Sequence, residues 1–261
     1  MYKRIVVKVG TKVLSKDDGT IDADVMRHLA EQIAALKKNS EVILVTSGAV
    51  GMGRSLLSLA EDTDGVVQKQ VFAAVGQVKL MSIYAELFAG QGIVCAQVLA
   101  TKEDFRDEQH YRNMKNCLEN LLRDNVIPVV NENDVVAVAE LLFTDNDELA
   151  GLIASQLSAQ AVVILTSVDG VLTGDPKDST ATVIPEIRLS DIASFQKYIT
   201  HEKTGSGRGG MQTKFSVAEK LAAEGITTHI VNGKKKNVLI DVVGGKQLGT
   251  RFVPKADQLR D

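Results

Sequence analysis

Two lysines beside glycines, near opposite ends of the sequence, have the chemistry that a phosphate group requires. Lys8 lies in an apolar run that ends at Gly10, and Lys214 follows the glycine-rich stretch 205–210. An ammonium group inside an apolar strand is costly unless an anion neutralises it. The backbone amides of Gly10 and Thr11, just after such a strand, would help to hold that anion. A side chain that turns out to solvent is the competing interpretation for Lys8.

Acidic and amide side chains cluster at two central positions. The run 131–134 (Asn-Glu-Asn-Asp) follows an apolar strand, where open α/β sheets bind ligands, although Asn and Asp are also common in turns. Thr144 and Asp145 suit the cap of the helix that follows, because acids near a helix N-terminus are favourable. That interpretation leaves Asn146 and Asp147 without an explanation, so we expect a site there.

A glycine-rich turn, 47–53, connects an expected strand at 41–46 to a helix. Unpaired amides at a helix N-terminus attract a carboxylate or a phosphate. Close packing of strand against helix through glycine explains the same residues equally well.

These features together favour phosphoryl transfer. This reaction needs cations around the migrating phosphoryl group and in-line placement of donor and acceptor, and little covalent chemistry. Two lysines with a carboxylate between them would meet that need. The stretch 205–210 also matches G-x-G-x-x-G, but no strand precedes it, so it is not a dinucleotide fingerprint. The sequence contains no P-loop, serine-hydrolase or zinc-protease motif.

The elements that must position these residues alternate along the chain. Apolar runs predict strands at 5–9, 41–46, 93–99, 126–130, 161–165, 226–231 and, as a closing edge, 249–252. Helical spacing predicts helices at 23–36, 66–89, 107–123, 149–157, 211–223 and 237–243. We expect a small hairpin at 135–143 and an irregular, mobile excursion at 177–210. Such alternation predicts an α/β fold with a mostly parallel sheet covered by helices on both faces.

Composition excludes several other classes of protein. The 261 residues are 44% hydrophobic and 24% charged, as in ordinary soluble proteins. A net charge of −3 and 4% aromatic residues argue against nucleic acid as a partner. No apolar run approaches the ~18 residues of a membrane span, and no signal peptide precedes the first strand. We therefore expect a cytoplasmic protein with free thiols at Cys95 and Cys117 and no protein-held metal.

Six stretches resemble the glutamate 5-kinase branch of the amino acid kinase family, in the expected order: 7–11, 45–49, 73–77, 130–134, 145–147 and 209–214. The resemblance implies a single three-layer αβα domain over residues 1–261, in which about 1–160 bind the amino acid and about 161–261 bind ATP. It also implies the reaction of ATP with L-glutamate to give L-glutamyl 5-phosphate and ADP, with Mg²⁺, as the first step of proline synthesis.

The resemblance assigns roles to particular residues. Lys8 and Lys214 correspond to the lysines that neutralise the transferring phosphoryl group, and Asp147 to the acid that orients both. Glutamate ligands are implied at Ser47, Asp134 and Asn146, with Gly48 and Ala49 in the same loop. Nucleotide contacts are implied at Lys8, Gly10, Thr166, Ser167, Arg208, Gly209, Gly210, Met211, Gln212, Thr213 and Lys214. Ser167 stands where the family often has Asp, and its hydroxyl can still donate.

Other interpretations stay open at this point. The same family includes N-acetylglutamate, aspartate, carbamate and uridylate kinases, and Asp134, suited to a free α-ammonium group, favours glutamate over its acetylated form. A non-catalytic amino-acid sensor would not need two lysines and an acid. The resemblance further implies feedback inhibition by proline and a homo-oligomer (dimer or tetramer). It also implies a kinase domain without the C-terminal accessory (PUA) domain of many relatives.

Overall fold

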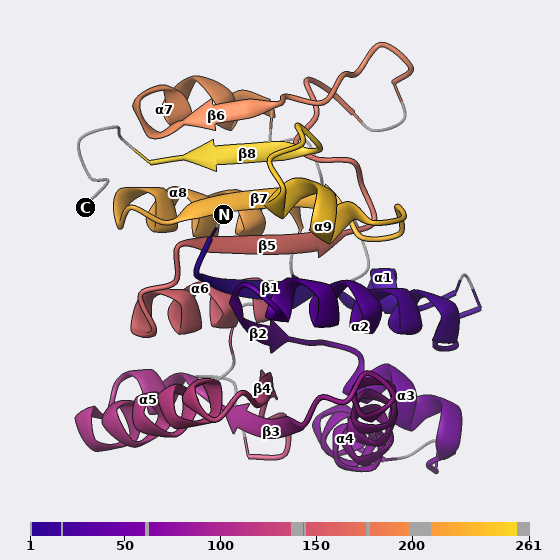
Figure 1. Cartoon of the computed structure of the whole chain (residues 1–261). Coiled ribbons are helices and arrows are strands. Elements are labelled where there is room, and N and C mark those ends of the chain that lie inside the picture. Colours follow the sequence, from indigo (N-terminus) through magenta and orange to yellow (C-terminus); the bar gives the residue numbers. More distant parts are fainter. Residues whose placement is uncertain are drawn as a thin grey trace.

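A computed structural model describes residues 2–16, 18–60, 63–136, 143, 145–175, 178–198 and 210–254. Within this part of the chain, one sheet has eight strands in the order β3-β4-β2-β1-β5-β7-β8-β6, stacked one above another in Figure 1. They are β1 (Arg4–Val9), β2 (Glu41–Val45), β3 (Cys95–Ala100), β4 (Ile127–Glu132), β5 (Ala161–Thr166), β6 (Glu186–Arg188), β7 (Thr227–Asn232) and β8 (Thr250–Val253). Neighbours pair in parallel except β7 and β8, so β8 and β6 run opposite to the others.

Helices cover both faces of this sheet. The α-helices are α1 (Thr11–Leu14), α2 (Ala23–Lys37), α3 (Ala49–Leu56), α4 (Gly65–Ala89), α5 (Glu108–Arg123), α6 (Asn146–Gln156), α7 (Ile192–Phe195), α8 (Met211–Ala223) and α9 (Val238–Val243). One core joins the sheet to α5, α6 and α8 through residues such as Leu118, Ile153 and Leu221. The other joins it to α2, α4 and α9. The predicted αβα sandwich around a mostly parallel sheet is therefore confirmed.

The central strand β1 decides where Lys8 lies. Its side chains alternate between faces: Ile5, Val7 and Val9 enter the core on the α2 and α4 side, and Val6 enters the opposite core. Lys8 shares the face of Val6 and therefore points towards α6 and α8. Its strand pairs with β2 on one side and β5 on the other, so Lys8 has neighbours in every direction.

Helix α6 begins three residues before the predicted start at Leu149. Oδ1 of Asp145 accepts hydrogen bonds from the backbone N–H groups of Asp147 at 2.8 Å and Glu148 at 3.2 Å, and so caps the helix. Asn146 and Asp147 consequently form its first turn. The prediction of a later start was wrong because polar residues in a first turn carry no apolar periodicity.

The carboxyl-terminal part of the sheet also differs from expectation. The predicted closing edge at 249–252 is β8, which lies between β7 and β6 and is not an edge. The true edge strand, β6, falls inside the stretch predicted to be irregular, and so does α7. A strand of three residues, with only Ile187 fully buried, is too short to show a periodicity. Residues 137–142 of the predicted hairpin and 199–209 of the excursion lie outside the described residues.

Helices α3 and α4 are in direct backbone contact through two glycines. A Cβ atom on Gly76 would lie 1.8 Å from the carbonyl oxygen of Ala49, and one on Gly53 would lie 1.9 Å from that of Phe72. Any side chain at either position would force the helices apart. This crossing fixes the start of α3, and with it the loop 46–48, against the sheet.

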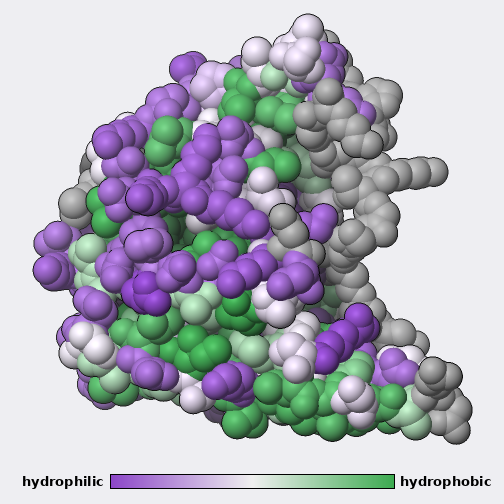
Figure 2. All heavy atoms as spheres, turned by 90° about the vertical axis from the view of Figure 1, so that its right-hand side faces the viewer, coloured by the Kyte–Doolittle hydropathy of each residue, from purple (hydrophilic) through white to green (hydrophobic). Residues whose placement is uncertain are grey.

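Helix α4 also carries an exposed apolar face. Val67, Val75 and Val78 are exposed, Val78 by 73%. Figure 2 shows hydrophobic side chains gathered over the lower part of one face of the molecule, at the height at which Figure 1 places α3 and α4. Among the described residues, α4 alone has the length and apolar composition of a membrane span. Core helices of soluble proteins have the same length and composition, so this feature alone does not indicate a membrane span.

Candidate active site

Lys8, Asp147 and Lys214 form a buried cluster of charges. Nζ of Lys8 lies 2.7 Å from Oδ1 of Asp147, and Nζ of Lys214 lies 2.8 Å from Oδ2. The three residues come from β1, α6 and α8. Asp147 is completely buried and both lysines nearly so. The structure thus brings together two ammonium groups that are 206 positions apart in the sequence.

Asp147 is ionised between the two lysines. Burial alone would raise the pKa of Asp147, but the ammonium groups of Lys8 and then Lys214 outweigh it and hold that pKa below its usual value. The carboxylate of Asp145 interacts with the same two lysines. Water screens these buried charges poorly, so the lysines can act strongly on an anion that enters the cavity above them.

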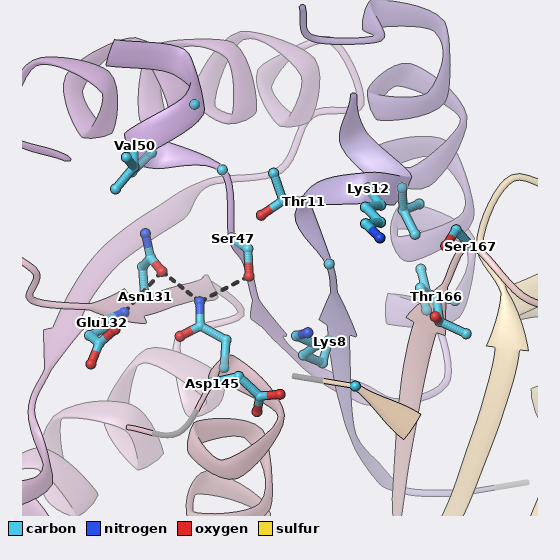
Figure 3. Close-up of a pocket in the computed structure, with 18 of the residues that line it drawn as sticks. Lys8, Thr11, Lys12, Ser47, Val50, Asn131, Glu132, Asp145, Thr166 and Ser167 are labelled. Carbon is cyan, nitrogen blue, oxygen red and sulfur yellow. Dashed lines mark hydrogen bonds between the residues drawn. The ribbon is translucent and has the colours of Figure 1, made fainter. Parts of the chain in front are cut away.

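A cavity of about 750 Å³ opens above this cluster, at the carboxyl ends of the parallel strands. This is where open α/β sheets bind ligands. Most of the predicted site residues line it: Lys8, Gly10, Ser47, Gly48, Ala49, Asp134, Asn146, Thr166, Ser167, Gly210, Met211 and Lys214. Figure 3 shows Thr166, Ser167 and Lys12 on one side, and Ser47, Asn131 and Glu132 on the other, with Lys8 between them.

Some predicted contacts are placed differently. Gln212 and Thr213 lie on α8 but are not among the residues that line the cavity, and Asp147 lies beneath it. Arg208 and Gly209 lie outside the described residues. The expectation that the Gly10 amide is available to a phosphate was wrong. That N–H donates to the carbonyl oxygen of Leu165 at 3.3 Å and so extends the pairing of β1 with β5.

On the side of the cavity formed by Ser47 and Asn131, the side chain of Asn146 is held in a fixed orientation. Its Nδ2 donates to the carbonyl oxygen of Thr46 at 2.6 Å, and lies 3.0 Å from Oγ of Ser47 and 2.9 Å from Oδ1 of Asn131. A backbone carbonyl only accepts, so the nitrogen of the amide must face it. The amide hydrogens of Asn146 are therefore used by the protein, and among the described residues no partner is found for its Oδ1, which can accept from a ligand.

A relay of amides behind Asn146 sets this direction. Oδ1 of Asn131 also accepts the N–H of Glu132 at 2.9 Å, and its Nδ2 donates to Oε1 of Gln77 at 2.9 Å. Nε2 of Gln77 in turn donates to Oε1 of Gln97 at 3.0 Å. Gln77 and Asn131 are buried. Each amide in the relay has only one favourable orientation, so the site is preorganised before any ligand binds.

Comparison with known proteins places this geometry in a family. Residues 3–232 match the model of the amino acid kinase family. A glutamate 5-kinase of Bacteroides thetaiotaomicron is 49% identical over 259 residues, which cover 98% of this chain and 71% of the relative. A glutamate 5-kinase from Chlorobaculum tepidum is 47% identical, and the matched region covers 72% of its length. The chain belongs to the glutamate 5-kinases of the amino acid kinase family.

Solved structures agree with this glutamate 5-kinase fold. Carbamate kinase from Giardia lamblia, bound to AMP-PNP, superposes with a TM-score of 0.68 at 17% identity and covers 97% of the chain. UMP kinase from Ureaplasma parvum superposes with a TM-score of 0.66 at 16% identity and also covers 97% of the chain. In both superpositions, 99% of the solved chain is matched. At these identities the likeness concerns the fold alone.

Asp145 is a site residue of this kinase that the sequence showed only as a helix cap. Its carboxylate lines the cavity, and its buried Oδ2 has no hydrogen-bond partner among the described residues. Burial, together with the negative charge of Asp147, raises the pKa of Asp145 to about 6. Three polar residues in succession at 145–147, more than a cap requires, were the available signal.

Three cations that line the cavity were not predicted: Lys12, Arg54 and Lys69. Lys12 follows the strand end that the sequence did identify. Lys69 forms an ion pair with the predicted glutamate ligand Asp134. Arg54 lies over the ring of Phe72, 5.6 Å from its centroid. Their spacing follows no motif, because each depends on how α1, α3 and α4 pack around the cavity.

The described residues offer no dedicated cage for a metal. Among the described residues, no group of three or more His, Cys, Asp or Glu side chains could hold an ion. Mg²⁺ commonly binds through one or two carboxylates together with substrate phosphates. Asp145, with its unpartnered buried oxygen, fits such a role, and the site suits Mg²⁺ delivered with the phosphates of ATP.

Proposed function

We propose that this chain transfers the γ-phosphoryl group of ATP to the γ-carboxylate of L-glutamate. The products are L-glutamyl 5-phosphate and ADP, and the reaction is the first step of proline synthesis. The observation that carries the proposal is the Lys8–Asp147–Lys214 cluster beneath a cavity large enough for two substrates. The 49% identity to a glutamate 5-kinase supports this amino acid over other acceptors.

The two substrates occupy different sides of the cavity in this proposal. Glutamate lies against Ser47, Asp134 and Asn146, where Oδ1 of Asn146 accepts a hydrogen bond from the α-ammonium group. ATP lies against Thr166, Ser167 and the start of α8. The migrating phosphoryl group then passes over Lys8 and Lys214, one from each half of the chain. Contacts from Arg208, Gly209, Gln212 and Thr213 remain predictions.

The cluster supplies electrostatic stabilisation and positioning. A carboxylate with an ordinary pKa near 4.3 is ionised at pH 7, so the nucleophile requires no general base. The difficulty is the repulsion between that carboxylate and the phosphates. Two ammonium groups held by one acid reduce it without having to reorganise, because Asp147 fixes both beforehand. Mg²⁺, when bound, would neutralise further phosphate charge.

A non-catalytic amino-acid sensor is the second candidate, and the cluster disfavours it. Burying three charges costs several kcal/mol per ion before their attraction is counted. A protein that only bound glutamate would gain nothing from two lysines and an acid buried together beneath the cavity. N-acetylglutamate, aspartate, carbamate and uridylate kinases are disfavoured as well. The solved UMP and carbamate kinases reach only 16–17% identity, against 49% for the glutamate 5-kinase.

The test is trapping of the acyl phosphate with hydroxylamine in the presence of ATP and Mg²⁺. We expect hydroxamate formation that depends on glutamate, with one ADP released per hydroxamate. N-acetylglutamate, aspartate, bicarbonate with ammonia, and UMP are tested as alternative acceptors. For each of them, the reaction is measured as the release of ADP. Product from one of these and none from glutamate would refute the substrate assignment.

Three further properties belong to the same proposal. Proline, the end product of the pathway, inhibits by competing with glutamate. The protein is a homo-oligomer, and the exposed valines of α4 lie in the contact between copies. The enzyme acts in the cytoplasm, where its substrates are abundant.

A further inference from the structure

Lys69 occupies a position on α4 where the helix pattern calls for an apolar residue. The buried stripe of this helix includes Phe72, Ala73, Gly76 and Leu80. Lys69 lies three, four and seven residues before the first three of these, and so on the same face. Its side chain is only 29% exposed and lines the cavity. Placing a cation on a buried face costs free energy unless an anionic group contacts it.

The partner of Lys69 is Asp134, whose side chain is 11% exposed. A second contact ties the same two segments together, because Nε2 of Gln70 donates to the carbonyl oxygen of Val135 at 3.0 Å. The ion pair is therefore not the sole described contact that holds α4 to the chain after β4. The ammonium has three donors and the carboxylate about four acceptor sites, so each group can serve the other and a ligand.

We propose that Lys69 determines specificity by binding the α-carboxylate of the amino-acid substrate, next to Asp134, which binds the α-ammonium. The pair presents one positive and one negative group side by side on the cavity wall. An α-amino acid carries the opposite charges on adjacent groups of one carbon. The inference rests on the proposed function for the identity of the amino acid, and adds the recognition of its head group.

The other cations of the cavity are placed for different tasks. Lys8 and Lys214 are bound to Asp147 on its floor. Figure 3 places Lys12 next to Thr166 and Ser167, on the nucleotide side. Arg54 is exposed and lies over the ring of Phe72. Of the cations that line the cavity among the described residues, Lys69 is the one ion-paired to a predicted glutamate ligand.

The test is the affinity of three ligands, measured by titration calorimetry, which needs no turnover. Glutamate has both head groups, glutarate lacks the α-ammonium, and 4-aminobutyrate lacks the α-carboxylate. In Lys69→Met we expect glutamate and glutarate to bind at least ~10-fold more weakly, as for loss of a charged hydrogen bond. Binding of 4-aminobutyrate should be unchanged or tighter, because Asp134 loses a competing cation.

Two variants serve as controls. Lys69→Arg keeps the charge and should retain most of the affinity for glutamate. Lys79→Met makes the same change on an exposed part of α4 that does not line the cavity, and should change nothing. Circular dichroism and thermal melting establish that each variant is folded. In the hydroxamate assay, Lys69→Met should raise KM for glutamate and leave kcat and KM for ATP near their original values, since the contact is made equally before and during transfer.

Several results would overturn the inference. Equal weakening of all three ligands in Lys69→Met would show a general disturbance of the site. Unchanged glutamate binding would show that the ion pair is only structural. A selective loss of glutarate binding in Arg54→Met but not in Lys69→Met would move the role to Arg54. Selective, Lys69-dependent glutamate binding without hydroxamate formation would refute the proposed reaction and leave the head-group inference standing.

Discussion

Lys8 and Lys214 are bound to the two oxygens of a single carboxylate, at 2.7 Å and 2.8 Å from Asp147. The acid holds the ammonium groups at a fixed separation that their mutual repulsion would otherwise increase. Because one lysine comes from the central strand β1 and the other from the start of α8, the cluster also joins the two halves of the chain.

Removing either lysine should abolish most of the turnover. Preorganised groups aimed at developing charge contribute about 3–4 kcal/mol each, so Lys8→Ala and Lys214→Ala should each lower kcat at least ~100-fold. Hydroxamate formation gives the rate, and circular dichroism shows whether the fold is retained. Lys220→Ala, on the exposed side of α8, is the matched control. Near-normal turnover in either cluster variant would remove that lysine from the reaction.

Neutralising Asp147 should cost stability as well as rate. Asp147→Asn has nearly the same shape but removes the negative charge that both buried ammonium groups contact. Breaking a buried ion pair from one side costs about 3–5 kcal/mol. Urea unfolding should show a loss of this order. Asp124→Asn, where the side chain is 69% exposed, should change the unfolding free energy little. Equal unfolding free energies for Asp147→Asn and Asp124→Asn would contradict a stabilising role for the buried carboxylate.

Asp145 gives the protein a pH-dependent stability. Its folded pKa of about 6 lies above the unfolded value of 3.8, so this group favours folding fully below pH 3.8 and loses that contribution as the pH rises through 6. A shift of about two pH units corresponds to about 3 kcal/mol. Asn is neutral at every pH and is an equally good N-cap. Asp145→Asn should therefore stabilise the protein at pH 8 and much less at pH 4.5.

Unfolding in urea at the two pH values measures this effect. The variant and the original protein should converge as Asp145 becomes protonated. A stability difference that is the same at pH 4.5 and pH 8 would show that the carboxyl does not titrate between them.

Gly76→Ala should separate α3 from α4. The added Cβ would meet the carbonyl oxygen of Ala49 at 1.8 Å, a backbone atom that cannot turn away. We expect a loss of at least ~1–3 kcal/mol, as for overpacking, together with a higher KM for glutamate because the loop at Ser47 moves. Gly65→Ala is the control, since its Cβ would meet nothing within 4 Å. Equal melting temperatures for Gly76→Ala and Gly65→Ala would contradict the close backbone contact between α3 and α4.

Val78→Glu should weaken the self-association that we propose through α4. This valine is 73% exposed on the apolar face of α4, and a buried unpaired carboxylate in a contact between copies is costly. Sedimentation velocity should show a shift towards smaller species, with the monomer fold intact by circular dichroism. An unchanged distribution of oligomers would place the contact elsewhere. Val94→Glu, at an exposed position outside α4, is the matched control.

The sequence by itself determined the layers of this protein and the residues at its chemical centre. Apolar strands such as 5–9 indicated central strands of a parallel sheet, and the lysine inside that strand pointed to an anion beside it. Asp22 and Asp107 cap α2 and α5, and such a cap depends only on neighbours along the chain. These features are local, so periodicity and residue type reveal them.

Tertiary structure alone decided which side chains meet. The order of the strands places β1 between β2 and β5, and α6 beneath them, so that Asp147 reaches both lysines. The roles of Asp145 and Lys69 depend likewise on burial and on partners from other segments. Contacts between residues far apart in the chain arise from packing against a common sheet. Local sequence carries no signal for them, because the energy that forms them belongs to the assembled core.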